Sequence, residues 1–232
     1  MKSKILKIAA ILGSLRKKSY NRALLVECAK MIKNRASVDI CDILEIPVYN
    51  QDVEDNGIPG PVIELKKKIG AADGILFATP EYNFSVSGVL KNAIDWASMP
   101  SGKSSFTGKP AGIIGASIGM LGTARAQYHL RQICTGLNMH VMNKPEIFVT
   151  NVDKKFDDNG ELIDNNTVKS LSAYLDQFLK WFWQLIHFPL RWMHIITSFP
   201  GVASQACLRS NKVQPDSFSC QGARHRRDLR SP

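Results

Sequence analysis

The sequence lacks the closely spaced cysteine sets of a disulfide framework or a zinc site. Its five cysteines are odd in number, are scattered and include no CxxC pair (Cys28, Cys41, Cys134, Cys207 and Cys220). Both kinds of site need paired or clustered cysteines, so we expect neither disulfides nor a bound metal. Unpaired thiols are typical of a reducing compartment, and we therefore expect a cytoplasmic protein.

The sequence also lacks an apolar run long enough to cross a membrane. Residues 182–199 are aromatic and apolar, but Pro189, Arg191 and two histidines interrupt them. A transmembrane helix needs roughly 20 consecutive apolar residues. Residues 1–8 carry charges without the apolar core of a signal peptide, and they are better explained as the start of a strand. We expect no transmembrane segment.

Acidic residues are in the minority, at 20 against 30 Lys and Arg, which gives a net charge of +10. Residues 1–180 hold 23 basic and 18 acidic side chains, or +5. Residues 181–232 hold seven and two, again +5, in less than a third of that length. The main body is thus only mildly basic. Because nucleic-acid binding domains carry a concentrated basic surface, we expect no nucleic-acid partner.

The character of the sequence changes after about residue 182. Residues 200–232 are polar, rich in Ser, Gln and Arg, and without periodicity, which is typical of disorder. We predict one domain over residues 1–182 and a basic, poorly ordered C-terminal extension over residues 183–232. The extension is interpreted as a segment outside the functional unit; a partner-binding or interfacial appendage is the alternative.

Apolar strands and amphipathic helices alternate along the first 182 residues. The pattern predicts strands over 5–12, 38–40, 74–79, 111–116 and within 141–149, the last interrupted near Pro145. It predicts helices over 24–32, 61–69, 88–98, 126–137 and from Asn166 or Thr167 to Phe182, with a surface loop over 44–61. This alternation predicts an α/β fold, a doubly wound five-stranded parallel sheet that binds its ligands at the carboxyl edge.

Residues 13–22, Gly-Ser-Leu-Arg-Lys-Lys-Ser-Tyr-Asn-Arg, join the first strand to the first helix. Gly13 permits a sharp turn, and the backbone N–H groups and the helix N-terminus attract an anion. Ser14, Ser19 and Asn21 offer short hydrogen-bonding side chains, and Arg16 adds a charged contact. Neither GxGxxG nor a P-loop is present, so the segment suits a terminal phosphate rather than a pyrophosphate. A solvated, capped helix start is the alternative.

Residues 80–96, Pro-Glu-Tyr-Asn-Phe-Ser-Val-Ser-Gly followed by Val-Leu-Lys-Asn-Ala-Ile-Asp-Trp, follow a buried strand and open a helix. They place Tyr82 and several polar groups at the edge of the sheet where ligands bind. In the alternative interpretation, Glu81 only caps the helix over 85–98 and Tyr82 is a packed surface aromatic.

These two segments together resemble the NADPH-dependent FMN reductase family, and within it the bacterial chromate and quinone reductases. Residues 106–110, 124–132 and 141–146 fit the same family, and the likeness covers about residues 4–182. Ser87 stands where the family motif has proline, and we expect this difference to loosen the first turn of the helix.

The resemblance implies a flavodoxin-like fold, noncovalently bound FMN and reduction by NADPH or NADH. It implies that the first segment holds the FMN phosphate, that the second lines the isoalloxazine ring, and that residues 117–120 approach the pyrimidine edge of the ring. The implied cofactor-binding residues are Ser14, Leu15, Arg16, Ser19, Asn21, Pro80, Glu81, Tyr82, Asn83, Ser117, Ile118 and Gly119. No side chain is implied as catalytic, because flavin N5 accepts the hydride.

The resemblance further implies ping-pong transfer to small acceptors such as quinones, azo compounds or chromate, by a homodimer or homotetramer. We expect Arg125, Tyr128 and Glu146 at a subunit interface rather than against substrate, His129 at the surface or core edge, and Cys134 as inert core. A flavodoxin-type electron carrier that docks to protein partners is the alternative function. The mildly basic body disfavours it, because such carriers usually have acidic surfaces.

Overall fold

The computed structural model describes the backbone of residues 5–197 and the side chains of residues 5–186. Its strands are β1 (Leu6–Leu12), β2 (Ala36–Cys41), β3 (Gly74–Ala78), β4 (Pro110–Ala116), β5 (His140–Val141) and β6 (Phe148–Val149). All pairs are parallel, in the order β2-β1-β3-β4-β5, with β6 also paired to β4. This is the strand order of flavodoxin-like folds, and it confirms the predicted fold class.

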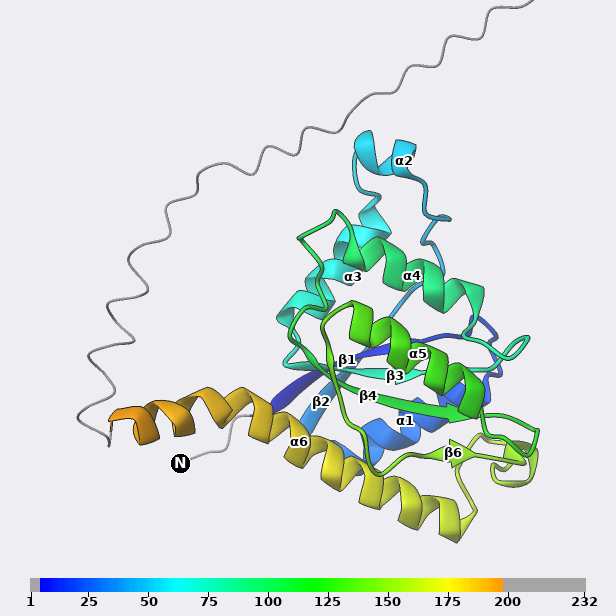
Figure 1. The fold of residues 1–232 in the computed structure, drawn as a ribbon. Coiled ribbons are helices and arrows are strands. Elements are labelled where there is room, and N and C mark those ends of the chain that lie inside the picture. The colour runs from blue at the N-terminus through cyan, green and yellow to red at the C-terminus, as the bar shows by residue number, and fades with distance from the viewer. Residues whose placement is uncertain (1–4, 198–232) are drawn as a thin grey trace, which may run out of the picture. The chain divides into compact units, whose positions relative to one another are not determined.

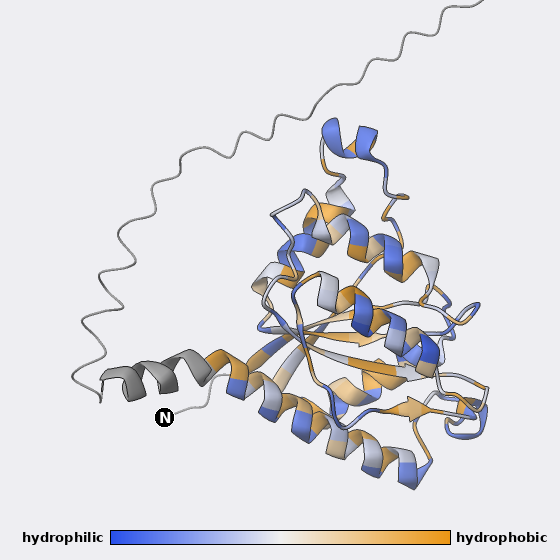
Figure 2. Ribbon diagram, viewed as in Figure 1, coloured by the Kyte–Doolittle hydropathy of each residue, from blue (hydrophilic) through white to orange (hydrophobic). Residues whose placement is uncertain are grey.

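The helices cover both faces of the sheet (Figure 1). They are α1 (Tyr20–Ile32), α2 (Gln51–Asp55), α3 (Gly60–Ala71), α4 (Gly88–Ser98), α5 (Ala124–Gly136) and α6 (Asn165–Thr197), with a short 3-10 turn at Val152–Lys154. Helices α1 and α6 pack against one face of the sheet, and α3, α4 and α5 pack against the other. Figure 2 accordingly shows the strands as largely hydrophobic and the helices as amphipathic.

The central strands are apolar throughout because both of their faces are buried. In β1, Ile8 and Ala10 belong to the core on the α1 and α6 side, whereas Ala9 and Ile11 belong to the core under α3, α4 and α5. Each strand end at the carboxyl edge is thereby fixed from two sides, which gives the following loops a rigid base.

Helix α6 lies on the sheet through a row of aromatic rings. Tyr174 and Phe178 are stacked with ring centroids 5.9 Å apart, and the Phe178 and Phe182 centroids are 4.2 Å apart. A Cβ atom on Gly112 would lie 2.3 Å from the Phe178 ring, and one on Gly74 would lie 2.3 Å from Phe182. Glycine at these two strand positions therefore allows the helix to approach the sheet closely.

Two details of the predicted secondary structure were wrong. The expected surface loop over 44–61 contains α2, which Asn50 caps by accepting a hydrogen bond from the Asp52 N–H at 2.9 Å. This helix buries no residue, so it leaves no apolar periodicity in the sequence. Helix α6 continues beyond Phe182 to Thr197. The interruption of the last strand near Pro145 was correct, since β5 and β6 lie on either side of it.

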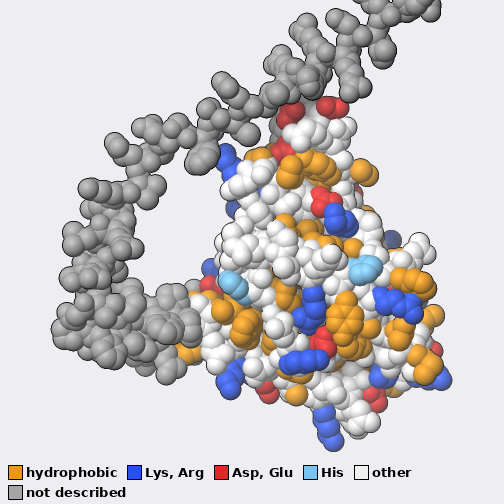
Figure 3. Space-filling model, in the orientation of Figure 1, with side chains coloured by type: hydrophobic (Ala, Val, Ile, Leu, Met, Phe, Trp, Pro, Cys, Tyr) orange, Lys and Arg blue, Asp and Glu red, His pale blue; other side chains and the backbone are white. Residues whose placement is uncertain are grey.

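By its internal contacts the chain divides into residues 1–187 and residues 188–232. The predicted boundary at 182 stays a prediction, and the predicted disorder of 200–232 lies outside the described residues. In the part of the chain that the structure describes, no helix is long and apolar enough to cross a membrane. Basic and acidic side chains are interspersed over the face seen in Figure 3.

Candidate functional site

Three loops begin where neighbouring strands end, at the carboxyl edge of the sheet. They are the β1–α1 loop (residues 13–19), the β3–α4 loop (residues 79–87) and the β4–α5 loop (residues 117–123). The Gly13 N–H donates to the Ala78 carbonyl at 2.8 Å, and the Thr79 N–H donates to the Ile114 carbonyl at 3.0 Å. These bonds continue the strand pairing into the loops and hold the loop starts side by side.

The β1–α1 loop places buried hydroxyls beneath exposed positive charges. Ser19 caps α1 by accepting a hydrogen bond from the Arg22 N–H at 3.4 Å, and the Ser14 Oγ accepts one from the Arg16 N–H at 3.4 Å. Both serines are buried, whereas Arg16, Lys17 and Lys18 are exposed. A cationic loop at the N-terminus of a 13-residue helix is suited to bind an anionic group.

Asn21 holds α1 against the end of β4. Its Nδ2 donates to the Ala116 carbonyl at 3.0 Å, and its Oδ1 accepts from the Ala116 N–H at 2.9 Å. The side chain is 4% exposed, so both halves of the amide are used inside the protein. The structure thus gives Asn21 an architectural role, and its predicted contact with a phosphate stays a prediction.

The β3–α4 loop contains a tight turn with an unusual backbone. The Tyr82 N–H donates to the Ser85 carbonyl at 3.1 Å, and the Ser85 N–H donates to the Tyr82 carbonyl at 3.0 Å. Between them, Asn83 and Phe84 have φ angles of 49° and 64°. Left-handed backbone in a bulky residue costs about 1–3 kcal/mol and is concentrated at functional sites. The Arg125 guanidinium carbon lies 3.8 Å from the Phe84 ring centroid.

Glu81 caps α5, not the helix that follows it in the sequence. Its Oε2 accepts hydrogen bonds from the Arg125 N–H at 3.1 Å and the Ala126 N–H at 3.3 Å. Thr123, the residue at the N-cap position, is left-handed and makes no side-chain cap. The alternative interpretation, in which Glu81 caps the helix over 85–98, is therefore wrong, because Glu81 supplies the missing acceptor at the start of α5 instead.

Ser87 supplies the cap of α4. Its Oγ accepts a hydrogen bond from the Leu90 N–H at 3.3 Å and donates one to the Gly13 carbonyl at 2.6 Å. The residue is 3% exposed. The expectation that a serine here loosens the first helical turn is therefore wrong, since the hydroxyl satisfies one of the free N–H groups at the start of the helix.

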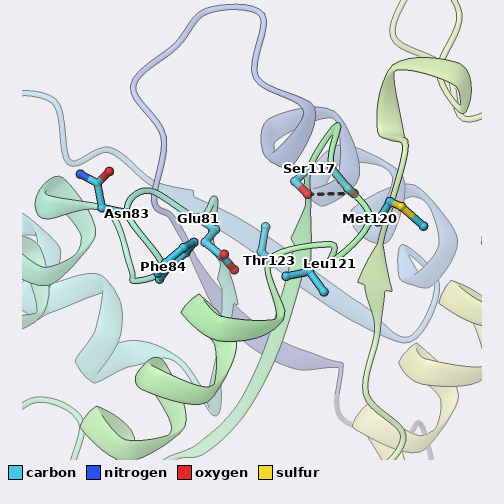
Figure 4. A pocket seen from close by; sticks show the side chains of 8 residues that line it. Glu81, Asn83, Phe84, Ser117, Met120, Leu121 and Thr123 are labelled. Carbon is cyan, nitrogen blue, oxygen red and sulfur yellow. Dashed lines mark hydrogen bonds between the residues drawn. The ribbon is translucent and has the colours of Figure 1, made fainter.

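The β4–α5 loop is held by β6 and by the residues that follow it. The Ser117 N–H donates to the Val149 carbonyl at 3.0 Å, and the Ser117 carbonyl accepts from the Val152 N–H at 3.1 Å. The Ser117 hydroxyl turns back onto its own loop and donates to the Gly119 carbonyl at 3.3 Å (Figure 4). Ile118 and Met120 are left 68% and 84% exposed.

A cavity of about 550 Å³ lies between the β3–α4 and β4–α5 loops (Figure 4). It is lined by Glu81, Asn83, Phe84, Ser117, Gly119, Met120, Leu121 and Thr123. Two further hollows of about 590 and 570 Å³ border the β1–α1 loop; Arg16 and Ser19 line the first, and Ser14 and Leu15 line the second. The structure thus brings the loops that carry the predicted residues to one edge of the sheet, where the residues line separate hollows rather than a single one. Four of the predicted residues line none of these three hollows: Asn21, Pro80, Tyr82 and Ile118.

Four cavity residues are absent from the predicted cofactor-binding set: Phe84, Met120, Leu121 and Thr123. Phe84 lies inside the segment over 80–96 that carries the family resemblance, and Met120 lies in the segment over 117–120 that the resemblance places near the ring, so their positions were a usable signal. Thr123 had none, because its place depends on the left-handed turn that precedes α5. Of the predicted residues, Pro80 is buried at the end of β3, and Tyr82 is 51% exposed beside the cavity loop.

The residues expected at an interface do not form one cluster within the chain. Arg125 lies 3.8 Å from the Glu81 carboxylate, whereas Glu146 pairs with Lys144 at 2.5 Å and with the Arg131 Nε at 3.6 Å. Tyr128 is 53% exposed, so its side chain is accessible to another molecule. Their assignment to a subunit interface stays a prediction.

Two minor predictions are confirmed. His129 is exposed, and its Nδ1 lies 2.9 Å from the Ser85 Oγ. Cys134 is fully buried, and burial raises the pKa of its thiol to about 12, which keeps the thiol protonated and unreactive. Among the residues that the structure describes, no group of His, Cys, Asp and Glu could hold a metal ion.

The site has the properties that FMN requires. The cavity has the volume of a typical cofactor site, and its exposed Phe84, Met120 and Leu121 offer apolar surface to a planar ring. Within the described residues, the N–H groups of Asn83, Phe84 and Gly119 donate to no protein acceptor, so they are available to ring oxygens and nitrogens. The cationic β1–α1 loop on the same edge suits the phosphate.

The family model for NADPH-dependent FMN reductase matches residues 6–154. The chain is 47% identical to an NAD(P)H-dependent FMN reductase of Pseudomonas aeruginosa, over 76% of this chain and 95% of the relative. It is 44% identical to a 2-hydroxy-1,4-benzoquinone reductase of Burkholderia, over 76% and 96%.

Among solved structures, the flavoenzyme NAD(P)H:(acceptor) oxidoreductase FerB of Paracoccus denitrificans superimposes with a TM-score of 0.73 at 36% identity. The match covers 78% of this chain and 98% of that one. With the parallel sheet and the site at its carboxyl edge, these matches show that the chain belongs to the NADPH-dependent FMN reductase family.

Proposed function

We propose that this protein binds FMN across the three carboxyl-edge loops and uses it to pass electrons from NAD(P)H to quinones. Its enzyme class, an NAD(P)H-dependent oxidoreductase with FMN as cofactor, follows from its family. The observation that carries the placement is the adjacency of an anion-binding loop and an apolar cavity with free N–H donors at one sheet edge. FMN supplies the hydride acceptor and donor when bound.

The protein's own residues position the cofactor. The β1–α1 loop binds the phosphate through Arg16 and the N-terminus of α1. The strained turn of the β3–α4 loop presents the Asn83 and Phe84 N–H groups to the edge of the ring, and the β4–α5 loop closes the opposite side through Gly119. No side chain of the cavity is assigned as an acid or base.

The order of binding is proposed to be ping-pong. Phe84 and Met120 line the cavity and are themselves exposed, so we expect one ring face to stay accessible and the nicotinamide and the acceptor to use this face in turn. Quinones are proposed as acceptors because the Burkholderia relative is named for a benzoquinone. Azo compounds and chromate are further acceptors to test.

We further propose that two or four copies assemble with the cavity near an interface. Phe84 and Met120 line the cavity, Tyr82 and Ile118 lie in the same two loops, and all four are more than half exposed. We propose that another subunit covers this apolar surface. Sedimentation equilibrium of the flavin-loaded protein measures the assembly; a monomer at micromolar concentration would contradict it.

A cytoplasmic location is supported by three free, buried cysteines.

The proposed position of the FMN phosphate is tested by replacing each of two exposed arginines with alanine. Arg16→Ala is expected to weaken FMN binding by about 10- to 100-fold, because a charge-assisted bond to the phosphate is lost. The control is Arg35→Ala, which removes a surface ion pair with Asp176 at 2.6 Å away from the site and is expected to leave FMN affinity unchanged. Equal affinity in the Arg16 variant and the parent protein would mean that the phosphate binds elsewhere.

The activity is tested by steady-state oxidation of NADPH or NADH with a benzoquinone as acceptor. Parallel lines in double-reciprocal plots are expected for the ping-pong order. A flavodoxin-type carrier would consume almost no nicotinamide without a separate reductase, so negligible turnover by the FMN-loaded protein would favour that alternative.

A further inference from the structure

One buried hydroxyl connects two of the loops that form the proposed FMN site. The Ser87 Oγ donates to the Gly13 carbonyl at 2.6 Å, across 74 residues of sequence, and accepts from the Leu90 N–H at 3.3 Å. Gly13 is also held from the other side, since its N–H donates to the Ala78 carbonyl at 2.8 Å. The first residue of the β1–α1 loop is thus bonded to both ends of the β3–α4 loop region.

We propose that Ser87 is a positioning residue that sets the β1–α1 loop for the FMN phosphate. This inference rests on the proposed placement of the phosphate in that loop. It assigns to Ser87 a role beyond capping α4: the hydroxyl fixes the carbonyl of Gly13 and thereby the direction in which the following loop leaves the sheet.

The two loops depend on Ser87 to different extents. The turn of the β3–α4 loop is held independently from α5, by Glu81 on the Arg125 and Ala126 N–H groups and by the Ser85 Oγ 2.9 Å from His129. The β1–α1 loop has less support, because residues 15–18 are exposed and the Ser14 bond to the Arg16 N–H is local. Loss of the Ser87 hydroxyl should therefore release the phosphate end of the site and leave the ring end in place.

The close packing around Gly13 strengthens the effect of Ser87 on the position of the β1–α1 loop. A Cβ atom on Gly13 would lie 3.1 Å from both the Pro80 ring and the Leu90 side chain, so the loop start is enclosed by residues on either side of Ser87. The carbonyl that Ser87 bonds is buried with it, and a buried carbonyl that loses its donor favours a backbone that turns toward another partner.

A Ser87→Pro variant tests whether Ser87 positions the β1–α1 loop separately from its effect on the folding of α4. Ser87 has φ −65° and ψ 147°, which is the φ that a proline ring imposes, and within the described residues its N–H donates to no other group. Ser87→Pro therefore keeps the backbone path into α4 while it removes the hydroxyl. Like Ser87→Ala, this variant loses the cap, but proline also restricts the unfolded chain, so we expect Ser87→Pro to be less destabilised than Ser87→Ala.

The test measures how fast the full-length protein releases FMN and, separately, riboflavin, which lacks the phosphate. We expect Ser87→Pro to release FMN about 3- to 10-fold faster than the parent, as for the loss of one hydrogen bond, and riboflavin at the same rate within twofold. Ser87→Ala should show the same split and also a lower urea midpoint, because the cap is lost.

The matched control is Ser98→Ala at the far end of α4. Its hydroxyl donates to the Asp95 carbonyl at 2.7 Å, so the variant loses a comparable bond from the same helix. It is expected to release both flavins at the parent rate. Similar acceleration in the Ser98 variant would overturn the proposal, since any hydroxyl of α4 would then suffice.

Two more results would overturn it: FMN release at the parent rate in both Ser87 variants, or equal acceleration of FMN and riboflavin. Arg16→Ala distinguishes this failure from failure of the proposed site. If Arg16→Ala weakens FMN binding and Ser87→Pro does not, the phosphate placement stands and the role of Ser87 fails. If neither variant affects FMN, the placement itself fails.

Discussion

Replacement of Glu81 distinguishes a helix cap from a ligand of the flavin. In the structure, its Oε2 accepts from two backbone N–H groups at the start of α5, at 3.1 and 3.3 Å. Removing a cap of this kind costs about 0.5–2 kcal/mol. A carboxylate at a helix N-terminus contributes a further ~0.3–1 kcal/mol. Glu81→Ala is therefore expected to reduce the free energy of unfolding by about 1–3 kcal/mol.

Glu81→Gln refines this expectation, because glutamine keeps an acceptor oxygen and loses only the charge. Its loss should be limited to ~0.3–1 kcal/mol. The assay is urea unfolding of the flavin-free protein, for which a slope of about 2 kcal/mol per molar urea converts 2 kcal/mol into a midpoint shift of about 1 M. Glu64→Ala, which disrupts only an exposed pair with Lys67 at 3.9 Å, is the control and should hardly shift the midpoint.

The result that would refute this reasoning is an unchanged midpoint in Glu81→Ala together with a large loss of FMN affinity. That pattern would mean that the carboxylate contacts the flavin and that α5 does not need it. Destabilisation of Glu81→Gln as large as that of Glu81→Ala would assign the whole effect to charge, which would contradict the two hydrogen bonds.

Three further predictions concern the body of the protein. Gly112→Ala should lower the free energy of unfolding by about 1–3 kcal/mol through a clash with Phe178, and Phe178→Leu in the same chain should restore part of it in thermal unfolding. Asn21→Ala should cost about 2–4 kcal/mol in urea unfolding, since both backbone groups of the buried Ala116 lose their partner. The three buried cysteines should resist iodoacetamide at pH 8 until urea is added, because burial raises the pKa of each thiol; labelling of the folded protein in a Cys207→Ser/Cys220→Ser background would contradict this.

The strands and the two site loops were predictable because their signals are local. Apolar runs predict buried strands, and the glycine and serines after β1 indicate the turn into α1. The partners of Glu81 and Ser87 were not predictable, because they lie 44 to 74 residues away and are brought near only by the sheet. A sequence shows that a residue can cap a helix, but the fold decides which helix it caps.

The bonds of Asn21 were not predictable for the same reason, because its partner is distant in the sequence. Its position in the first turn of α1, just after a loop that contains two serines, is typical of a phosphate ligand, yet the amide bonds both backbone groups of Ala116. The closeness of α1 to the end of β4 arises from the strand order, since β4 is separated from β1 by β3. Leu121 and Thr123, which the β4–α5 loop also contributes to the cavity, were missed for a similar reason: their positions depend on how β6 and the residues after it hold that loop.

The division of the last strand has a consequence for solubility. A sheet edge with a long row of free backbone groups invites pairing with strands of other molecules, which leads to aggregation. Here the outer side of β4 is occupied by β5 and β6, each of two residues, with Pro145 between them. Strands this short offer an incoming chain few groups to pair with, so the interruption at Pro145 protects the side of the sheet next to the cavity from intermolecular β-pairing.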